Sequence, residues 1–237
     1  MRSTAKFFQA LLLLIPAIAA EQDWTESQLA NLPKSEKPNH LFNGKDLTGW
    51  QGWEKYWTVV DGTIRGANEE SVPSSTYLFS KTSFRNFRLL LEVKQTRSKK
   101  HSTMHSAVAA LGEVKKDRGG NDHGFRGHLL MFCNDWGIWD AYRRNRIEPK
   151  GHRGQLKTKS EKVGDWNRVE IVAIGNRIRF VNNGALVFDF TDKPEMLKAS
   201  PVGLQLHANG RPQEFFFRGL VITESPEDKL VTLKAGE

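Results

Sequence analysis

Residues 168 to 190 read RVEIVAIGNRIRFVNNGALVFDF and contain the clearest topological signal in the chain. Two turn sequences, Gly175-Asn176 and Asn182-Asn183-Gly184, divide this stretch into three short segments in which polar and apolar residues largely alternate. A period of two is typical of a strand with one buried face, and Asn-Gly is a strong hairpin signal. The stretch therefore predicts three antiparallel strands of a meander. Its inward-facing residues are expected to be Val169, Ile171, Ala173, Ile178, Phe180, Leu186 and Phe188.

Short strands and tight turns continue on both sides of the meander. Asp61-Gly62 separates two short runs upstream, and residues 87 to 94 alternate over much of their length. Residues 202 to 207 and 214 to 222 form further runs downstream. No segment after residue 20 has a helical period over three turns, and residues 195 to 198 have room for one turn only. Closely spaced short strands predict an all-β fold, a single-domain antiparallel β-sandwich.

The first twenty residues have the three parts of a secretory signal peptide. Arg2 and Lys6 supply positive charge, residues 7 to 15 form an apolar run, and residues 17 to 20 end in small side chains. The apolar run is shorter than the roughly 20 residues that a transmembrane helix needs, and no cysteine follows it for a lipid anchor. We expect cleavage after Ala20, export to the periplasm or the extracellular medium, and no membrane anchor in the mature chain.

The exported part of the chain has the length of one domain with a substantial core. Residues 21 to 39 are polar and contain Pro33 and Pro38, which indicates a surface lead-in. Residues 40 to 224 hold all the predicted strands, and residues 225 to 237 form a C-terminal tail. The sequence does not indicate an oligomeric state.

Charge and cysteine content narrow the classes of partner. The formal net charge is +8, but Lys and Arg are interleaved with Glu and Asp along the chain. No tract is typical of a nucleic-acid site, so we expect a solvated basic surface and no nucleic-acid partner. Cys133 is the only cysteine, which excludes an intrachain disulfide, and its apolar neighbours predict a small buried hydrophobe.

Reactive side chains are most densely spaced between residues 122 and 146. The candidates are Asp140 and His128 as general acid or base, Arg126 and Arg143 as oxyanion ligands, and Trp136, Trp139 and Tyr142 as apolar faces for sugar rings. The alternative is that the tryptophans belong to the core, the arginines are solvated and Asp140 caps a turn.

No metal or other cofactor is predicted. His101 and His105 lie on one face of a predicted strand, as metal ligands do, but no cysteine or acidic partner accompanies them. The sequence has no glycine-rich phosphate loop, nucleophile elbow or zinc motif.

Several motifs resemble the 3-keto-disaccharide hydrolase domain family. The opening decapeptide LFNGKDLTGW at residues 41 to 50 is the most specific of them. The others are WTVVDGTIRG at 57 to 66, WNRVEI at 166 to 171, VNNG at 181 to 184, LQLH at 204 to 207 and FRGLVI at 217 to 222. The resemblance runs from about residue 40 to residue 224.

This resemblance implies a concanavalin-like jelly roll whose curved sheet forms a sugar-binding groove. It also implies a reaction in which a sugar already oxidised at C3 loses its C1 substituent. The ketone acidifies the proton on C2, a base removes that proton, the aglycone leaves, and water then adds back. His207 matches the family's LQxH motif and is therefore a third candidate for the catalytic site, although a partly buried structural histidine is the alternative. An oligosaccharide or a modified sugar is the expected ligand.

One strand departs from the family pattern. The family usually has a central strand that reads roughly GYEVQILD, whereas residues 127 to 134 here read GHLLMFCN. Leu129 and Met131 then occupy the positions of the Glu and the Gln, on one face of the strand. A shift of one residue would present His128, Leu130 and Phe132 instead. Either register has lost the family's carboxylate from this face.

Three functions stay open at this level. The first is a secreted hydrolase or lyase that cleaves the glycosidic bond of a C3-oxidised sugar. The second is a non-catalytic carbohydrate-binding sandwich that kept the groove without its acid. The third is a structural module of an exported assembly. Convergence of Asp140, His128 and His207 on an open groove would favour the enzyme, and their separation would favour the binder.

The signal peptide gives a direct prediction. Protein recovered from the periplasm or the medium should begin at Glu21, because the small residues before it fit signal peptidase. Intact-mass measurement tests this, and a mass that retains the first twenty residues would contradict it.

Overall fold

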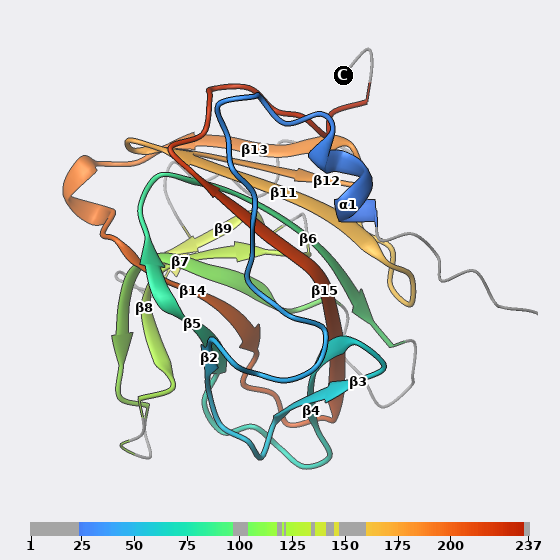
Figure 1. Cartoon of the computed structure of the whole chain (residues 1–237). Coiled ribbons are helices and arrows are strands. Elements are labelled where there is room, and N and C mark those ends of the chain that lie inside the picture. Colours follow the sequence, from blue (N-terminus) through green and yellow to red (C-terminus); the bar gives the residue numbers. More distant parts are fainter. Residues whose placement is uncertain are drawn as a thin grey trace, which may run out of the picture.

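The computed structural model describes residues 24–96, 104–117, 120, 122–133, 136–140, 145–146 and 160–234. Two antiparallel sheets pack face to face, and one short helix lies outside them (Figure 1). The predicted β-sandwich is therefore confirmed. No helix in the described ranges is long and apolar enough to cross a membrane.

Every strand pairing within the two sheets is antiparallel. The first sheet has the order β13 (Ala185–Thr191), β12 (Arg177–Asn182), β11 (Asn167–Ile174), β6 (Phe87–Gln95), β15 (Gln213–Glu224), β4 (Thr63–Asn68) and β3 (Trp57–Val60), with β1 (Asn39–His40) paired to β15. The second sheet has the order β10 (Asn145–Arg146), β9 (Ile138–Asp140), β8 (Gly124–Met131), β7 (Ala107–Lys115), β14 (Ser200–Leu206), β5 (Thr76–Phe84) and β2 (Trp50–Gln51). The described part of the chain includes the helix α1 (Trp24–Leu29) and the 3₁₀ turn η2 (Pro194–Met196).

The meander forms where the turn sequences predict it. β11 pairs with β12, and β12 pairs with β13, around Gly175-Asn176 and Asn183-Gly184. Asn183 and Gly184 both have positive φ, 52° and 85°, as do Asp61 and Gly62 in the β3–β4 hairpin. Positive φ at both central residues is the geometry that Asn-Gly and Asp-Gly turns adopt at low cost.

One expected core position is wrong. Leu186 is only half-buried, whereas Val187 is fully buried. A β-bulge interrupts the ladder, so that Phe180 pairs with Phe188 but Val181 pairs with Leu186. The bulge adds one residue to β13 and moves Leu186 off the inward face, which strict alternation does not predict.

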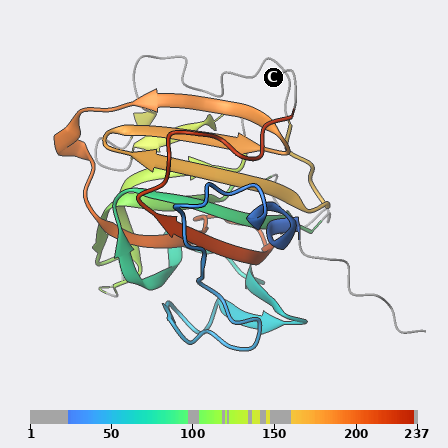
Figure 2. The same cartoon turned by 45° about the horizontal axis from the view of Figure 1, so that its top comes forward.

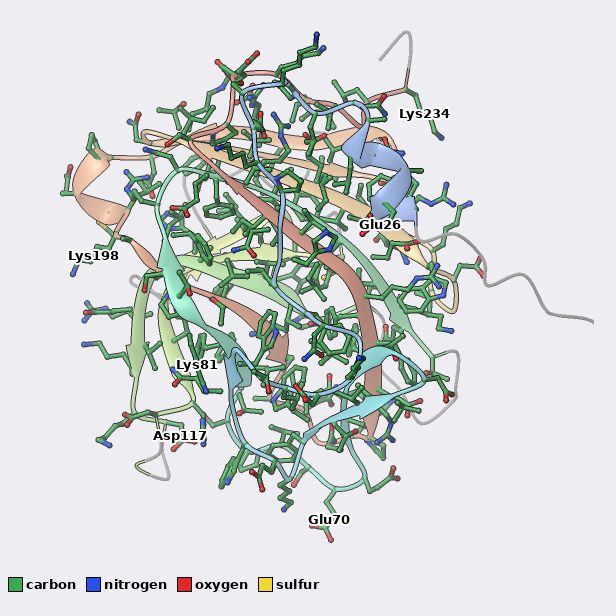
Figure 3. The ribbon with its side chains drawn as sticks, viewed as in Figure 1. Glu26, Glu70, Lys81, Asp117, Lys198 and Lys234 are labelled. Atoms are coloured by element: carbon green, nitrogen blue, oxygen red, sulfur yellow. The ribbon has the colours of Figure 1, made fainter. Side chains whose placement is uncertain are left out.

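The inner faces of the two sheets form the core. In the first sheet, Val169 and Ile171 pair with Leu91 and Leu89, and all four are fully buried. Phe132 and Phe217 join the sheets, with ring centroids 6.1 Å apart. Side chains fill the space between the sheets, while charged residues such as Lys81 and Lys198 lie at the periphery (Figure 3).

The lead-in and the C-terminal tail pack against the outer face of the first sheet. The lead-in crosses this sheet over β15, as Figures 1 and 2 show from two directions. Arg88, on the outer face of β6, is fully buried and donates two hydrogen bonds of 2.9 Å to Glu36 of the lead-in. It also binds Glu170 of β11 and the backbone carbonyl of Lys229 in the C-terminal tail.

Residues 21 to 39 are therefore more than the surface lead-in that their composition predicts. α1 gives them a short helix, and Glu36 is fully buried at its side chain. Burial alone would raise the pKa of the Glu36 carboxyl, but hydrogen bonds from Arg88 and Thr223 outweigh it and hold the pKa below its usual value.

Phe188 gives a stability test of the meander register. It is fully buried and stacks on Phe180 with ring centroids 5.3 Å apart. Phe188→Ala should lower the free energy of unfolding by about 3–5 kcal/mol, as for other buried aromatics. Denaturant melts measure this, with Leu186→Ala as the half-buried comparison. A cost below about 1 kcal/mol for Phe188→Ala would mean that this register is wrong.

Candidate functional site

A groove with a volume of 490 Å³ lies on the outer face of the second sheet. Its lining comes from β5, β8, β9 and β14 and from the segments beside them. The lining residues are Ser75, Tyr77, His105, Phe125, Leu129, Met131, Trp136, Trp139, Gln205 and His207.

Residues with small side chains lie in the middle strands of the second sheet. Ala109 of β7 pairs with Gly203 of β14 on one side and with Leu129 of β8 on the other. The Phe79 ring lies across Gly203, where a Cβ would come within 2.7 Å of the ring. The Phe79 ring thus occupies the space over Gly203, and glycine at position 203 permits this close approach.

Phe125 closes one end of the groove. Its ring lies against Gly127, where a Cβ would come within 2.6 Å of Phe125 Cε1. The ring centroid is 5.9 Å from those of Tyr77 and Phe79. This close approach explains why glycine occupies position 127.

Four half-buried rings form an arc along the opposite end. The ring centroids of His207 and His105 are 4.2 Å apart, those of His105 and Trp136 are 4.7 Å apart, and those of Trp136 and Trp139 are 5.7 Å apart. Flat apolar faces of this kind bind the C–H faces of ligands. We call these four residues the aromatic arc.

The two imidazoles are the titratable groups of the arc. Burial, and to a smaller extent the neighbouring His105, lower the pKa of His207 to about 4. His207 is therefore neutral at pH 7. Its position is fixed by its backbone, because Gln213 Nε2 donates a 2.5 Å hydrogen bond to the His207 carbonyl and Ala208 N donates to Ser75 Oγ at 3.0 Å.

Hydrogen-bonding groups gather beside His207. Gln205 Nε2 lies 3.1 Å from the Tyr77 hydroxyl, and Gln205 Oε1 is buried with no protein partner. Burial raises the pKa of Tyr77 well above its usual value, so the phenol keeps its proton. A buried amide oxygen is costly unless it accepts a hydrogen bond.

Three of the sequence-predicted site residues line this groove. They are Trp136, Trp139 and His207. The structure thus brings together two predicted sugar-stacking residues and one of the three predicted acid–base residues.

Two other predicted residues lie on the opposite side of β8. His128 is fully buried, and its Nε2 lies 2.8 Å from Asp192 Oδ2 between the sheets. Arg126, two residues earlier on the same side, is exposed and pairs in register with Glu113. His128 and His207 therefore do not converge, because the strand's alternation turns His128 into the core.

The side chains of the remaining predicted residues lie outside the described part of the chain. Asp140 is the register partner of His128, in the pairing of β8 with β9, and its side chain lies outside the described residues. Tyr142 and Arg143 lie wholly outside the described residues, as does His101. The roles of Asp140, Tyr142 and Arg143 stay predictions.

The register of β8 decides which face the altered family positions occupy. Leu129 and Met131 line the groove, while Leu130 and Phe132 are buried on the other side. The first of the two registers considered above is therefore the observed one. Among the groove-lining residues that the structure describes, none is a carboxylate.

Sequence patterns missed four polar or titratable residues of the groove. Ser75, Tyr77 and Gln205 come from β5, β14 and their ends, and His105 precedes β7. Each occupies an outward position of a strand or its extension, but alternation alone does not tell which outer face forms a groove. The sequence pattern indicates His105 only as a possible metal ligand together with His101.

The described side chains contain no cluster of three or more His, Cys, Asp or Glu residues arranged for a metal ion. Cys133 is buried, as its apolar neighbours predict. The described lining of the groove offers imidazoles, an amide, hydroxyls and aromatic rings.

A comparison with known families identifies the domain. The model of the 3-keto-α-glucoside-1,2-lyase-like domain matches residues 37–223. The chain belongs to this family. No curated protein matches the chain significantly.

Solved structures share the fold of this family member at low sequence identity. A protein named as a candidate glycosyl hydrolase from Parabacteroides distasonis is 18% identical, with a TM-score of 0.56, over 84% of this chain and 96% of the other. A second such protein from the same organism is 20% identical, with a TM-score of 0.54, over 79% and 99%. The carbohydrate-binding module CBM66 from Bacillus subtilis is 12% identical, with a TM-score of 0.50, over 74% and 96%. These likenesses show the jelly-roll fold.

The electrostatics of the arc give a pH prediction. In the folded protein the His207 ring should titrate near pH 4, well below the 6.5 of a free histidine, because burial and His105 both disfavour the imidazolium. In His105→Asn the pKa should rise but stay below 6.5, since burial remains. Nitrogen-detected NMR titration of the histidine side chains measures both values, and a wild-type value of 6 or above would contradict this account.

Proposed function

We propose that this chain is an exported carbohydrate-active protein that cleaves the glycosidic bond of a C3-oxidised sugar in the groove described above. The observation that carries this proposal is the His105–His207 pair at the wall of an aromatic-lined groove. Family membership supports the reaction class, and the signal-peptide pattern supports export.

The polar side of the groove suits a sugar ring. The Tyr77 hydroxyl, the Gln205 amide and the Ser75 hydroxyl offer donors and acceptors in one place, and the buried Gln205 Oε1 requires a donor. A sugar hydroxyl is such a donor. The aromatic arc supplies the apolar faces against which the ligand packs.

His207 is the proposed base. A ketone at C3 acidifies the proton on C2, and a neutral imidazole within reach can accept that proton. The C1–O bond then breaks as the C1–C2 double bond forms, and the aglycone oxygen takes up one proton. The low pKa makes His207 a weak base, but it also makes its protonated form a strong donor for that oxygen. Water then adds across the double bond, so the sequence needs no oxidant or reductant.

One observation favours a second function, a non-catalytic carbohydrate binder. Leu129 and Met131 stand in the groove at positions where the family pattern has Glu and Gln, and the described lining contains no carboxylate. His128, a predicted acid or base, points into the core. A binder needs the aromatic arc and the polar groups but no base.

Turnover of a 3-keto-glycoside tests the first function. His207→Ala should lower kcat/KM at least about 100-fold, the usual effect of losing a positioned acid or base. Asp140→Asn should have a smaller effect, because the steps above assign both proton transfers to His207 and Asp140 is the register partner of His128. Trp139→Ala should mainly weaken binding, because its role is packing. His40→Ala is the matched control, since this exposed histidine lies on β1 of the other sheet, and it should leave turnover unchanged.

The same assay separates the two functions. If the wild type cleaves no 3-keto-glycoside and Trp139→Ala abolishes sugar binding in calorimetry, the protein is a binder. If His207→Ala keeps full turnover while Asp140→Asn loses it, the base is Asp140 and the imidazole assignment is wrong.

A further inference from the structure

The groove has two halves of different chemistry. Its polar half, on β5, β14 and their ends, consists of Ser75, Tyr77, Gln205 and His207. Its apolar half, on β8, β9 and the turn between them, consists of Leu129, Met131, Trp136 and Trp139. β7 lies between the two halves in the sheet order, and its small residues Ala107 and Ala109 leave the halves connected.

The polar half has room and partners for one sugar ring. Its groups include a hydroxyl, a phenol, a primary amide with an unsatisfied oxygen, and a neutral imidazole. His207 lies at the edge of this half, 4.2 Å from His105 between ring centroids. The bond that breaks is therefore placed near the boundary between the halves.

The apolar half offers almost nothing to a second sugar. Its described side chains carry two indole N–H groups and a thioether sulfur, and Leu129 is wholly aliphatic. The His105 ring, 4.7 Å from Trp136 between ring centroids, is the one imidazole of the described lining beside this half. Against the described side chains of this half, a sugar would bury several hydroxyls without partners, and each such hydroxyl would weaken binding roughly 5- to 100-fold. A carbon chain or an aromatic ring would bury apolar surface against Met131 and the tryptophans at no such cost.

We propose that the apolar half is an aglycone site and that the substrate is the glycoside of a hydrophobic, non-sugar alcohol or phenol. This inference rests on the proposed function of the groove and adds the substrate class. The sugar carries the ketone and occupies the polar half, while the aglycone lies over Leu129 and Met131 and leaves as the free alcohol when its oxygen is protonated.

A series of 3-keto-glucosides with methyl, butyl and hexyl aglycones tests the inference. Their leaving groups have nearly the same acidity, so differences in kcat/KM report binding of the chain. Each buried methylene should raise kcat/KM about fourfold, and hexyl should exceed methyl by at least about 30-fold. A 3-keto-disaccharide should be cleaved less efficiently than the hexyl compound, although its leaving group is more acidic.

Two variants locate the effect. Met131→Gln keeps nearly the same size and adds an amide, and it should reduce the hexyl-to-methyl ratio about tenfold. Trp139→Ala should reduce the same ratio, and it is the fallback if Met131→Gln does not fold, because Trp139 is only half-buried. Val60→Thr, at an exposed residue of β3 in the other sheet, is the control and should leave both rates unchanged.

The outcomes separate this inference from the proposed function. If all compounds are cleaved with no dependence on chain length, or the disaccharide is the best substrate, the aglycone site is wrong and the lyase stands. If none is cleaved, the lyase is wrong. Calorimetric Kd values for the methyl-to-hexyl series then decide the aglycone site alone: about fourfold tightening per methylene supports it, and a flat series overturns it.

Discussion

The Arg88 guanidinium is the interaction on which the arrangement of this sandwich depends. It lies fully buried on the outer face of the first sheet, where it binds Glu36 and Glu170 and the carbonyls of Glu227 and Lys229. A buried charge is tolerated only when it is paired and fully hydrogen-bonded, and removing one partner typically costs about 3–5 kcal/mol. The lead-in and the tail must therefore stay in place over this sheet. The lead-in and the tail thereby cover part of one outer face of the sandwich, while the groove lies on the other.

Side chains of very different size are paired with one another across the second sheet beside the groove. Phe79, Gly203, Ala109, Leu129 and Trp139 lie side by side on neighbouring strands of the second sheet. The Phe79 ring covers Gly203 on one side of this row, and Leu129 and Trp139 line the groove on the other. In the proposed function, this shape presents a ligand to the aromatic arc, and the buried Gln205 amide and the His105–His207 pair face the same space.

The chemistry of the groove differs from that of a glycosidase with two carboxylates. Such enzymes use a pair of carboxyl groups at a defined separation, and the described lining here has none. An elimination next to a ketone needs only a base and a proton donor, which a pair of imidazoles can provide. In the proposed function, Leu129 and Met131 determine what the groove binds, and the imidazoles carry the reaction.

Local patterns in the sequence predicted the all-β class, the meander and its tight turns. Asp61-Gly62 and Asn183-Gly184 adopt the positive φ angles that their side chains tolerate, and alternation around Leu129 placed it on the face opposite His128. These features depend only on neighbours in the chain, because a strand's side chains alternate wherever it lies. Local patterns failed at Leu186, where a bulge set by pairing with β12 shifts the register.

The site itself was decided by tertiary structure. His128 and His207 look equally reactive in the sequence, but one pairs with Asp192 in the core and the other lines the groove. Glu36 looks like a solvated surface acid until Arg88 is packed above it. A side chain's chemistry depends on its burial and partners, and these come from segments far apart in the chain. The sequence alone therefore determined which residues were available, and the packing of the two sheets decided which of them meet.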